Sequence, residues 1–287
     1  MLKMLFIVLA FLSGAVALSH ELLWTRRLID LLGATEAVTG RVLGLFFLGL
    51  SLGGWLATRW CRSTGNSGIR LGIAEASIAI LSLPAIFLPY WADGLVGAIG
   101  IDLLVAWQGT VVKLLISALV VMPPAIAMGT TMPMFIRVIT DLGGTVRGSG
   151  IWIYAINMIG GVFGLWFVST FLLEQAGVRG AMLCAAAGNV VIAVVSFACA
   201  GKFSLQTEDS VVDTDQPKVE LSALEKFNRR TVFGLSFASG AIVLASEVLV
   251  LRLLNLIAPS SLQTTSCLLY TSPSPRDLST SRMPSSA

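Results

Sequence analysis

Long apolar stretches separated by short polar segments are the main pattern of the chain. A helix needs roughly 20 apolar residues to cross the hydrocarbon core of a bilayer, because it rises only about 1.5 Å per residue. Seven stretches reach or approach that length with few charged side chains. The pattern therefore predicts membrane-spanning helices at residues 4–24, 38–57, 71–91, 110–136, 151–173, 178–200 and 231–257.

The composition agrees with this pattern. Of the 287 residues, 55% are hydrophobic and 12% are charged, whereas about a quarter of the residues of an average soluble domain are charged. We expect an all-α, polytopic membrane helix bundle whose main partner is the lipid bilayer. The net charge of +3 does not indicate nucleic acid binding, because Lys and Arg of membrane proteins collect in cytoplasmic loops.

The distribution of Lys and Arg predicts the orientation of the bundle. Eleven lie on the side of the amino terminus: Lys3, Arg59, Arg62, Arg70, Arg137, Arg147, Lys202, Lys218, Lys226, Arg229 and Arg230. Five lie on the other side: Arg26, Arg27, Arg41, Lys113 and Arg179. Because short cytoplasmic loops carry the excess of positive charge, the amino terminus is predicted to be cytoplasmic.

Two segments outside the spans are polar enough to have other roles. Residues 92–108 carry Asp93 and Asp102 among apolar residues, which predicts a short amphipathic piece at the outer interface. Residues 201–230 are rich in acidic residues and cannot bury enough apolar surface to fold alone. They are predicted to form a cytoplasmic linker.

The fourth span contains Pro123, Pro124 and Pro133. Each proline removes a backbone donor and clashes with the preceding turn, so this helix should be kinked or locally unwound. Irregular backbone persists in a membrane only where it is buried in protein or lines a cavity. Four residues between these prolines are therefore candidates to present carbonyl groups to a substrate: Met128, Gly129, Thr130 and Thr131.

The first and seventh spans resemble each other at a fixed offset of 226 residues. Ser13-Gly14 recurs as Ser239-Gly240, Glu21 as Glu247, and Arg26 as Arg252. Six helices, a linker and the start of the same unit again are the plan of parallel-repeat transporters of the major facilitator type. The repeat predicts a six-helix half-bundle at 1–200, the linker at 201–230, and the start of a truncated second half at 231–266.

Four sequence blocks resemble the fused MFS/spermidine synthase family, a group of bacterial multi-pass membrane proteins. They are LSGAVALSHELLWTRRLIDLLGAT, LGLFFLGLSLGGWLATR, PPAIAMGTTMPMF and IYAINMIGGVFGLW. The resemblance covers about residues 5–200 and resumes at 231. It implies a location in the bacterial inner membrane and a downstream domain similar to polyamine aminopropyltransferases. The glycine-rich nucleotide-binding turn of such an enzyme has no counterpart in this sequence, so we expect no catalytic residue and no cofactor here.

The last 21 residues, 267–287, differ abruptly from the rest of the chain. Their sequence, CLLYTSPSPRDLSTSRMPSSA, resembles a translated sequencing adapter, so it is left out of the fold prediction. We expect the authentic sequence to stop near Ser266 and to be the front part of a longer protein.

Glu21 is the first candidate for a functional side chain, because an ionisable group within a span is costly unless it is paired or faces water. One interpretation is a substrate or proton site with Arg26, suited to a cationic polyamine. The other is a Glu-Arg pair that only fixes the helix ends. On the repeat, Glu247 and Arg252 would form a second copy of either.

Tyr154 and Asn157 fall on nearly one face of the fifth span, and Asn157 should face the bundle interior, where its amide finds a partner. They are candidates to line a cavity. Close helix packing is the preferred explanation for Gly160-x-x-x-Gly164 and Gly49-x-x-x-Gly53.

Glu75, near the start of the third span, is predicted to act with Arg59 or Arg70 as a cytoplasmic gate or a structural pair. His20, the only histidine, is expected to be an interfacial side chain with no metal site. Three functions stay open. The first is a transporter-like bundle for a small solute such as a polyamine, and the second is the membrane anchor of an aminopropyltransferase whose catalytic domain lies downstream. The third is a scaffold without transport.

Overall fold

The computed structural model of the chain describes residues 1–33, 36–62, 65–91, 94, 106–144 and 146–203, and nine residues between 231 and 246. Apart from turns, bends and a few residues without regular structure, these residues are helical and none is in a strand, which confirms the prediction of an all-α bundle. The chain divides into two compact units, Met1–Asp213 and Thr214–Ala287. The helices described below belong to the first unit.

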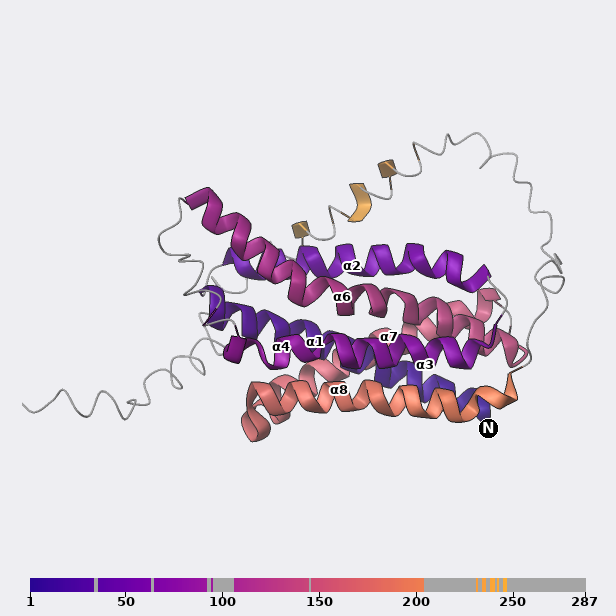
Figure 1. Cartoon of the computed structure of the whole chain (residues 1–287). Helices are drawn as coiled ribbons and strands as arrows, with labels where there is room; N and C mark the ends of the chain where they lie inside the picture. The colour runs from indigo at the N-terminus through magenta and orange to yellow at the C-terminus, as the bar shows by residue number, and fades with distance from the viewer. Residues whose placement is uncertain are drawn as a thin grey trace, which may run out of the picture. The chain divides into compact units, whose positions relative to one another are not determined.

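The helices follow the apolar stretches of the sequence. They are α1 (Leu2–Leu32), α2 (Glu36–Arg62), α3 (Ser67–Leu81), the short α4 (Leu83–Ile86), α6 (Ala106–Asp141), α7 (Val146–Phe167) and α8 (Leu173–Cys199), with a π-helix, η2 (Val168–Leu172), between the last two and a 3-10 turn, η3 (Ala200–Lys202), at the end. Within the described residues, five stretches are long and apolar enough to cross a membrane. The chain is therefore a multi-pass membrane protein, drawn in Figure 1.

The fifth of these stretches, Gly150–Lys202, is 53 residues long and is bent. The bend lies at Gly177, whose φ of 64° and ψ of −179° are not helical. This region of backbone conformation is essentially restricted to glycine. Gly177 therefore separates two crossings, close to where the sequence predicts a turn between the fifth and sixth spans.

Contacts between helix ends show which ends lie together. The Lys3 ammonium donates to the Gly143 carbonyl at 3.1 Å, so the start of α1 meets the end of α6. Asn66, which caps α3, donates to the Ala200 carbonyl at 2.6 Å. The start of α3 and the end of α8 are therefore also neighbours.

A second set of contacts joins the opposite ends. The Lys113 ammonium donates to the Leu32 carbonyl at 3.3 Å, so the start of α6 lies at the end of α1. Arg179, just after the bend in α8, donates to the Tyr90 hydroxyl at 2.9 Å. The four contacts show that α1 and α6 run antiparallel, as do α3 and α8, which is expected of helices that each cross the membrane once.

Helix α6 is continuous through Pro123, Pro124 and Pro133. The expectation of a locally unwound segment is therefore wrong, although the helix changes direction along its length (Figure 1). Neighbouring helices and hydroxyl groups can satisfy the backbone groups that a proline frees in a membrane helix, so the helix need not open. At 36 residues it is about 54 Å long, well beyond the thickness of the hydrocarbon core.

Glycines allow two pairs of helices to approach closely, which confirms the packing role predicted for them. A Cβ atom at Gly160 or Gly164 of α7 would overlap the backbone of α1. On α2, a Cβ at Gly53 would overlap the Ile126 carbonyl of α6, and one at Gly49 would lie 2.6 Å from the Ala125 Cβ. Both contacts are of the small-residue type by which membrane helices associate.

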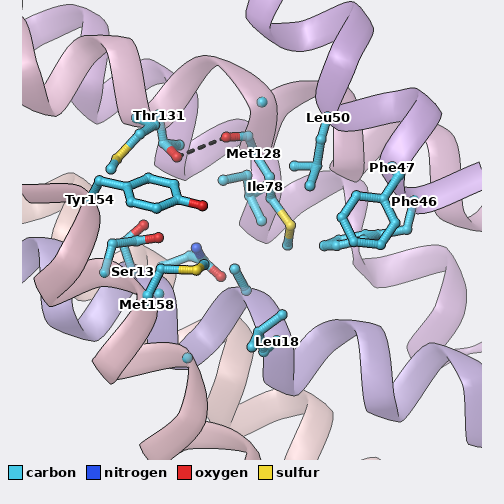
Figure 2. A pocket seen from close by; sticks show the side chains of 17 residues that line it. Ser13, Leu18, Phe46, Phe47, Leu50, Ile78, Met128, Thr131, Tyr154 and Met158 are labelled. Carbon is cyan, nitrogen blue, oxygen red and sulfur yellow. Dashed lines mark hydrogen bonds between the residues drawn. The ribbon is translucent and has the colours of Figure 1, made fainter. Parts of the chain in front are cut away.

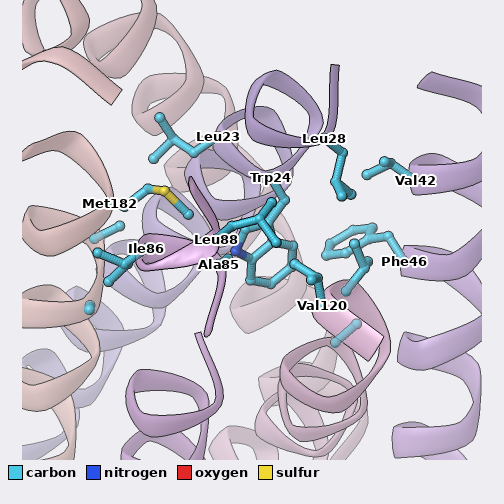
Figure 3. Packing of buried hydrophobic residues seen from close by; sticks show 14 of the residues in the cluster. Leu23, Trp24, Leu28, Val42, Phe46, Ala85, Ile86, Leu88, Val120 and Met182 are labelled. Atoms are coloured by element: carbon cyan, nitrogen blue, oxygen red, sulfur yellow. The ribbon is translucent and has the colours of Figure 1, made fainter. Parts of the chain in front are cut away.

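The buried apolar side chains form two clusters along the bundle. The Trp24 cluster includes Leu23, Trp24, Leu28, Phe46, Ile78, Ile86, Met182 and Ala186, and Figure 3 shows the ring of Trp24 close to that of Phe46. The Phe6 cluster includes Phe6, Leu9, Leu71, Phe135, Ile153 and Ile192. Along α1, α3 and α8, a polar residue separates the two clusters on each helix: Ser13, Glu75 and Asn189.

Candidate functional site

The three polar residues between the two clusters form one hydrogen-bonded group with His20, which we call the Glu75 network: Ser13, His20, Glu75 and Asn189. Ser13 donates its hydroxyl hydrogen to Glu75 Oε1 at 2.7 Å. Asn189 donates from Nδ2 to Glu75 Oε2 at 2.7 Å. The Nε2 atom of His20 lies 3.1 Å from Asn189 Oδ1. Three helices, α1, α3 and α8, thus contribute to one network.

The network is fully enclosed by the bundle. Glu75 and His20 are 0% exposed, Asn189 is 2% exposed and Ser13 is 4% exposed. Both carboxylate oxygens of Glu75 have a donor, yet both donors are neutral. Among the described residues, neither bond of the Glu75 carboxylate comes from a cation. A carboxyl group in the membrane interior without a cation is costly when ionised and marks a candidate functional site.

A cavity of about 360 Å³ lies beside this network. It is bounded by α1, α2, α6 and α7, with contributions from α3 and α8 (Figure 2). Figure 2 shows Ser13 and Tyr154 on one side of the cavity and Phe47 and Leu50 on the other. The polar residues of its wall are Ser13, Thr131, Tyr154, Asn157 and Asn189.

Ser13 and Asn189 belong to both the cavity wall and the Glu75 network. Glu75 itself does not line the cavity. The carboxyl group is thus separated from the cavity by the two side chains that bind it.

Five of the residues predicted from sequence line this cavity: Met128, Gly129, Thr131, Tyr154 and Asn157. The structure therefore brings together the fourth-span and fifth-span candidates. The Asn157 amide also donates to a backbone carbonyl of α1 at 3.1 Å, so it faces the bundle interior as predicted.

The backbone of α6 at the cavity is not open. The Met128 carbonyl accepts the Thr131 hydroxyl at 2.8 Å, and the Ala127 carbonyl accepts the Thr130 hydroxyl at 2.7 Å. Thr130 lies outside the cavity wall. The two hydroxyls bond back into their own helix, so the segment offers side chains to the cavity rather than freed carbonyls.

No protein family, curated protein or solved structure matches the chain. The site is therefore interpreted from its own geometry.

The pair Glu21 and Arg26 is not part of the cavity wall. Both residues are half-buried, and the backbone carbonyl of Glu21 accepts the Thr25 hydroxyl at 2.9 Å. Their predicted repeat partners, Glu247 and Arg252, lie outside the described residues.

The structure gives Arg59 and Glu75 different surroundings from those predicted. The guanidinium of Arg59 stacks over the Trp55 ring of its own helix at 4.3 Å. Arg70 donates to the Trp60 carbonyl at 2.6 Å. Glu75 bonds Ser13 and Asn189 instead of either arginine. Sequence proximity favoured the arginines, whereas the fold turns Glu75 toward α1 and α8.

His20 is also placed differently from the prediction. It is fully buried, not interfacial. Its ring stacks on Trp24 at a centroid distance of 5.2 Å, and its Nε2 atom meets Asn189. It therefore belongs to the interior of the bundle.

Sequence reasoning did not select Ser13 or Asn189 as functional residues. A usable signal exists for Asn189, because it is an amide within an apolar span and such a group must find a partner in the membrane. Ser13 has no comparable signal, since a serine can bond its own helix, as Ser19 does to the Ala15 carbonyl at 2.6 Å.

Proposed function

We propose that this chain is the membrane region of a transporter-like protein that binds a small solute in the cavity between α1, α2, α6 and α7. The observation that carries this proposal is the cavity itself, which lies within a membrane bundle and has polar side chains in a mostly apolar wall, beside a buried carboxyl group. Solute sites of secondary transporters lie near the middle of the membrane, between helices. A scaffold or a simple anchor does not require such a cavity.

The chemistry of the cavity favours a cationic solute with an aliphatic body, such as a polyamine. Phe46, Phe47, Leu50 and Met158 provide apolar wall, against which methylene groups can pack. Glu75 provides the nearby negative charge when it is ionised, and in a low-dielectric interior that charge acts over several ångströms.

We further propose that the complete protein has the MFS-like plan of two six-helix halves and that its amino terminus is cytoplasmic in a bacterial inner membrane. The antiparallel directions of α1 and α6, and of α3 and α8, support one crossing per helix. The excess of Lys and Arg at the end that holds Lys3 supports the orientation. Reporter fusions at Gly33 and Gly143 would test it, because the two loops should report opposite sides.

The second candidate is the membrane anchor of a polyamine aminopropyltransferase, supported by the four sequence blocks that resemble fused MFS/spermidine synthases. The gene sequence downstream separates the two candidates. A domain with a strand followed by a glycine-rich turn favours the enzyme, and five further spans without such a domain, which would complete two six-helix halves, favour the transporter.

Uptake of labelled spermidine and putrescine into vesicles that contain the full-length protein tests transport directly. Met158→Trp should abolish uptake, because the indole fills the cavity. Val162→Trp is the matched control, since Val162 is 67% exposed one turn further along the same helix. The proposal fails if wild-type vesicles take up no more than empty ones, or if both variants transport equally well.

A further inference from the structure

The Glu75 network gives each oxygen of the carboxylate one neutral donor and leaves the charge of the group unpaired. We propose that Glu75 is a proton-binding site, that the hydroxyl of Ser13 connects it to the cavity, and that this proton is the ion coupled to solute movement. The coupling rests on the function proposed above, whereas the proton site rests on the geometry of the network alone.

Ser13 is suited to pass a proton because its hydroxyl group can both donate and accept. With Glu75 ionised, the hydrogen of Ser13 points to Oε1, and the free lone pairs of its oxygen can accept from water in the cavity. At about 360 Å³, the cavity is far larger than the roughly 10–15 Å³ that one water molecule needs.

Proton uptake then follows a balanced sequence. A hydronium ion in the cavity gives a proton to Ser13 Oγ and becomes water. The original hydrogen of Ser13 moves to Glu75 Oε1, so the serine O–H bond breaks as the carboxyl O–H bond forms. The serine keeps one hydrogen, now directed to the cavity, and the new carboxyl hydrogen is donated back to Ser13 Oγ. Asn189 still donates to Oε2 in both states.

This sequence links the carboxyl group to the cavity wall. The wall presents an acceptor at Ser13 when Glu75 is ionised, and a donor when Glu75 is protonated. The negative charge beside the cavity disappears at the same step. A cationic solute and a proton therefore compete, which is the property that an exchange of one for the other requires.

Glu75 is the carboxyl group that titrates in this part of the bundle, because the charged groups on the neighbouring helices bind other partners. His20, two hydrogen bonds away through Asn189, is the titratable residue that α1 contributes to this network. On α3, Arg70 is turned to the Trp60 carbonyl. On the helices that pack on α3, Lys113 binds the Leu32 carbonyl, Arg137 pairs with Asp141, and Arg179 binds the Tyr90 hydroxyl.

His20 acts as a positioning residue in this scheme. With its hydrogen on Nε2, it donates to Asn189 Oδ1, which leaves the Nδ2 hydrogens of Asn189 for Glu75 and the cavity side. An asparagine without this neighbour could turn its amide over and place an oxygen against the carboxylate. The stacked Trp24 ring fixes the imidazole plane.

Infrared difference spectroscopy of the full-length protein in lipid vesicles, recorded while the pH is changed, tests the proton site without any solute. The expected result is a carbonyl band of a protonated carboxyl group that shifts in heavy water and is absent from Glu75→Gln. Glutamine resembles the protonated glutamate in shape, so this variant should fold. Wild-type spectra without such a band at any pH, or a band that persists in Glu75→Gln, would overturn the proposal.

The role of Ser13 has its own readout, the rate at which the carboxyl hydrogen exchanges with heavy water. Ser13→Ala should keep the band and slow this exchange at least tenfold, whereas Ser13→Thr should restore it. Equal exchange rates in all three proteins would rule out Ser13 as the connection.

Spermidine uptake with and without an imposed pH gradient separates the two proposals. Uptake that responds to the gradient in wild type and loses that response in Glu75→Gln supports both. Uptake that ignores the gradient in wild type refutes the coupling and leaves the transporter standing. An infrared band without any uptake refutes the transporter and leaves the proton site standing.

Discussion

The contact between α1 and α7 depends on the absence of side chains at Gly160 and Gly164, and Gly164→Ala tests this directly. A Cβ atom at Gly164 would lie 2.5 Å from the Ala15 Cα and 2.6 Å from its carbonyl carbon, besides overlapping the carbonyl oxygen. All these neighbours are backbone atoms, so no side-chain rotation can relieve the overlap. The two helices have to separate.

The cost can be estimated from the distances. Ordinary contacts of a Cβ atom begin at 3.4 Å, so the helices must move apart by about 1 Å at this point, a gap that forfeits a quarter to a half of each dispersion contact it opens. Overpacking of this kind costs about 1–3 kcal/mol. The control is Gly44→Ala on α2, where a Cβ meets nothing within 4 Å and helix propensity gains up to about 1 kcal/mol.

Unfolding of the two variants by a denaturing detergent in mixed micelles, followed by tryptophan fluorescence, measures the difference. Gly164→Ala should be less stable than Gly44→Ala by about 1–3 kcal/mol, the cost of overpacking alone, because both substitutions gain the same helix propensity. Adding Gly160→Ala should cost less than its own single effect, because the helices have already separated. Equal stability of the two single variants would refute the close contact between α1 and α7.

Three further expectations concern single contacts, each measured by the same unfolding assay. Asn66→Ala should lower the unfolding free energy by about 1–2 kcal/mol, because it removes a helix cap and the bond to the Ala200 carbonyl. Asn66→Ser keeps a cap, so its unfolding free energy should lie between those of Asn66→Ala and the wild type; equal losses in the two variants would contradict this. Gly177→Ala should lower the unfolding free energy by about 1–3 kcal/mol, because alanine is strained in the backbone conformation of Gly177. The control Gly201→Ala, with free space around it, should lower it by less than about 0.5 kcal/mol. Asn157→Leu should cost only about 0.6 kcal/mol, the average for a membrane hydrogen bond; a loss several times larger would show that this amide does more than bond α1.

The fold class was predictable because it depends on length and polarity alone. An apolar stretch of about 20 residues has few structures open to it in a membrane, since each backbone amide must be satisfied within the segment. The closely packed glycines were predictable for a similar reason, because the four-residue spacing of Gly160 and Gly164 places both on one helix face. The continuity of α6 through its prolines was not predictable, because neighbouring helices decide whether prolines open a helix.

The cavity was partly predictable, and the Glu75 network was not. Met128, Gly129, Thr131, Tyr154 and Asn157 stand out as polar, small or flexible residues within spans, and the structure places them around one cavity. The partners of Glu75 lie 62 and 114 positions away along the chain. No local pattern links three helices, so the sequence suggested the nearby arginines instead.

The position of the Glu75 network between the two apolar clusters gives it a second consequence for the bundle. Apolar side chains can slide past one another at little cost, whereas the bonds of Glu75 to Ser13 and Asn189 form at one register of α1, α3 and α8. An ionised carboxyl group without its two donors in this interior would cost several kcal/mol. The same bonds that hold the carboxyl group beside the cavity therefore also fix how the three helices are aligned. A proton that arrives at Glu75 lowers the cost of losing those bonds, which makes this alignment easiest to change when the site is protonated.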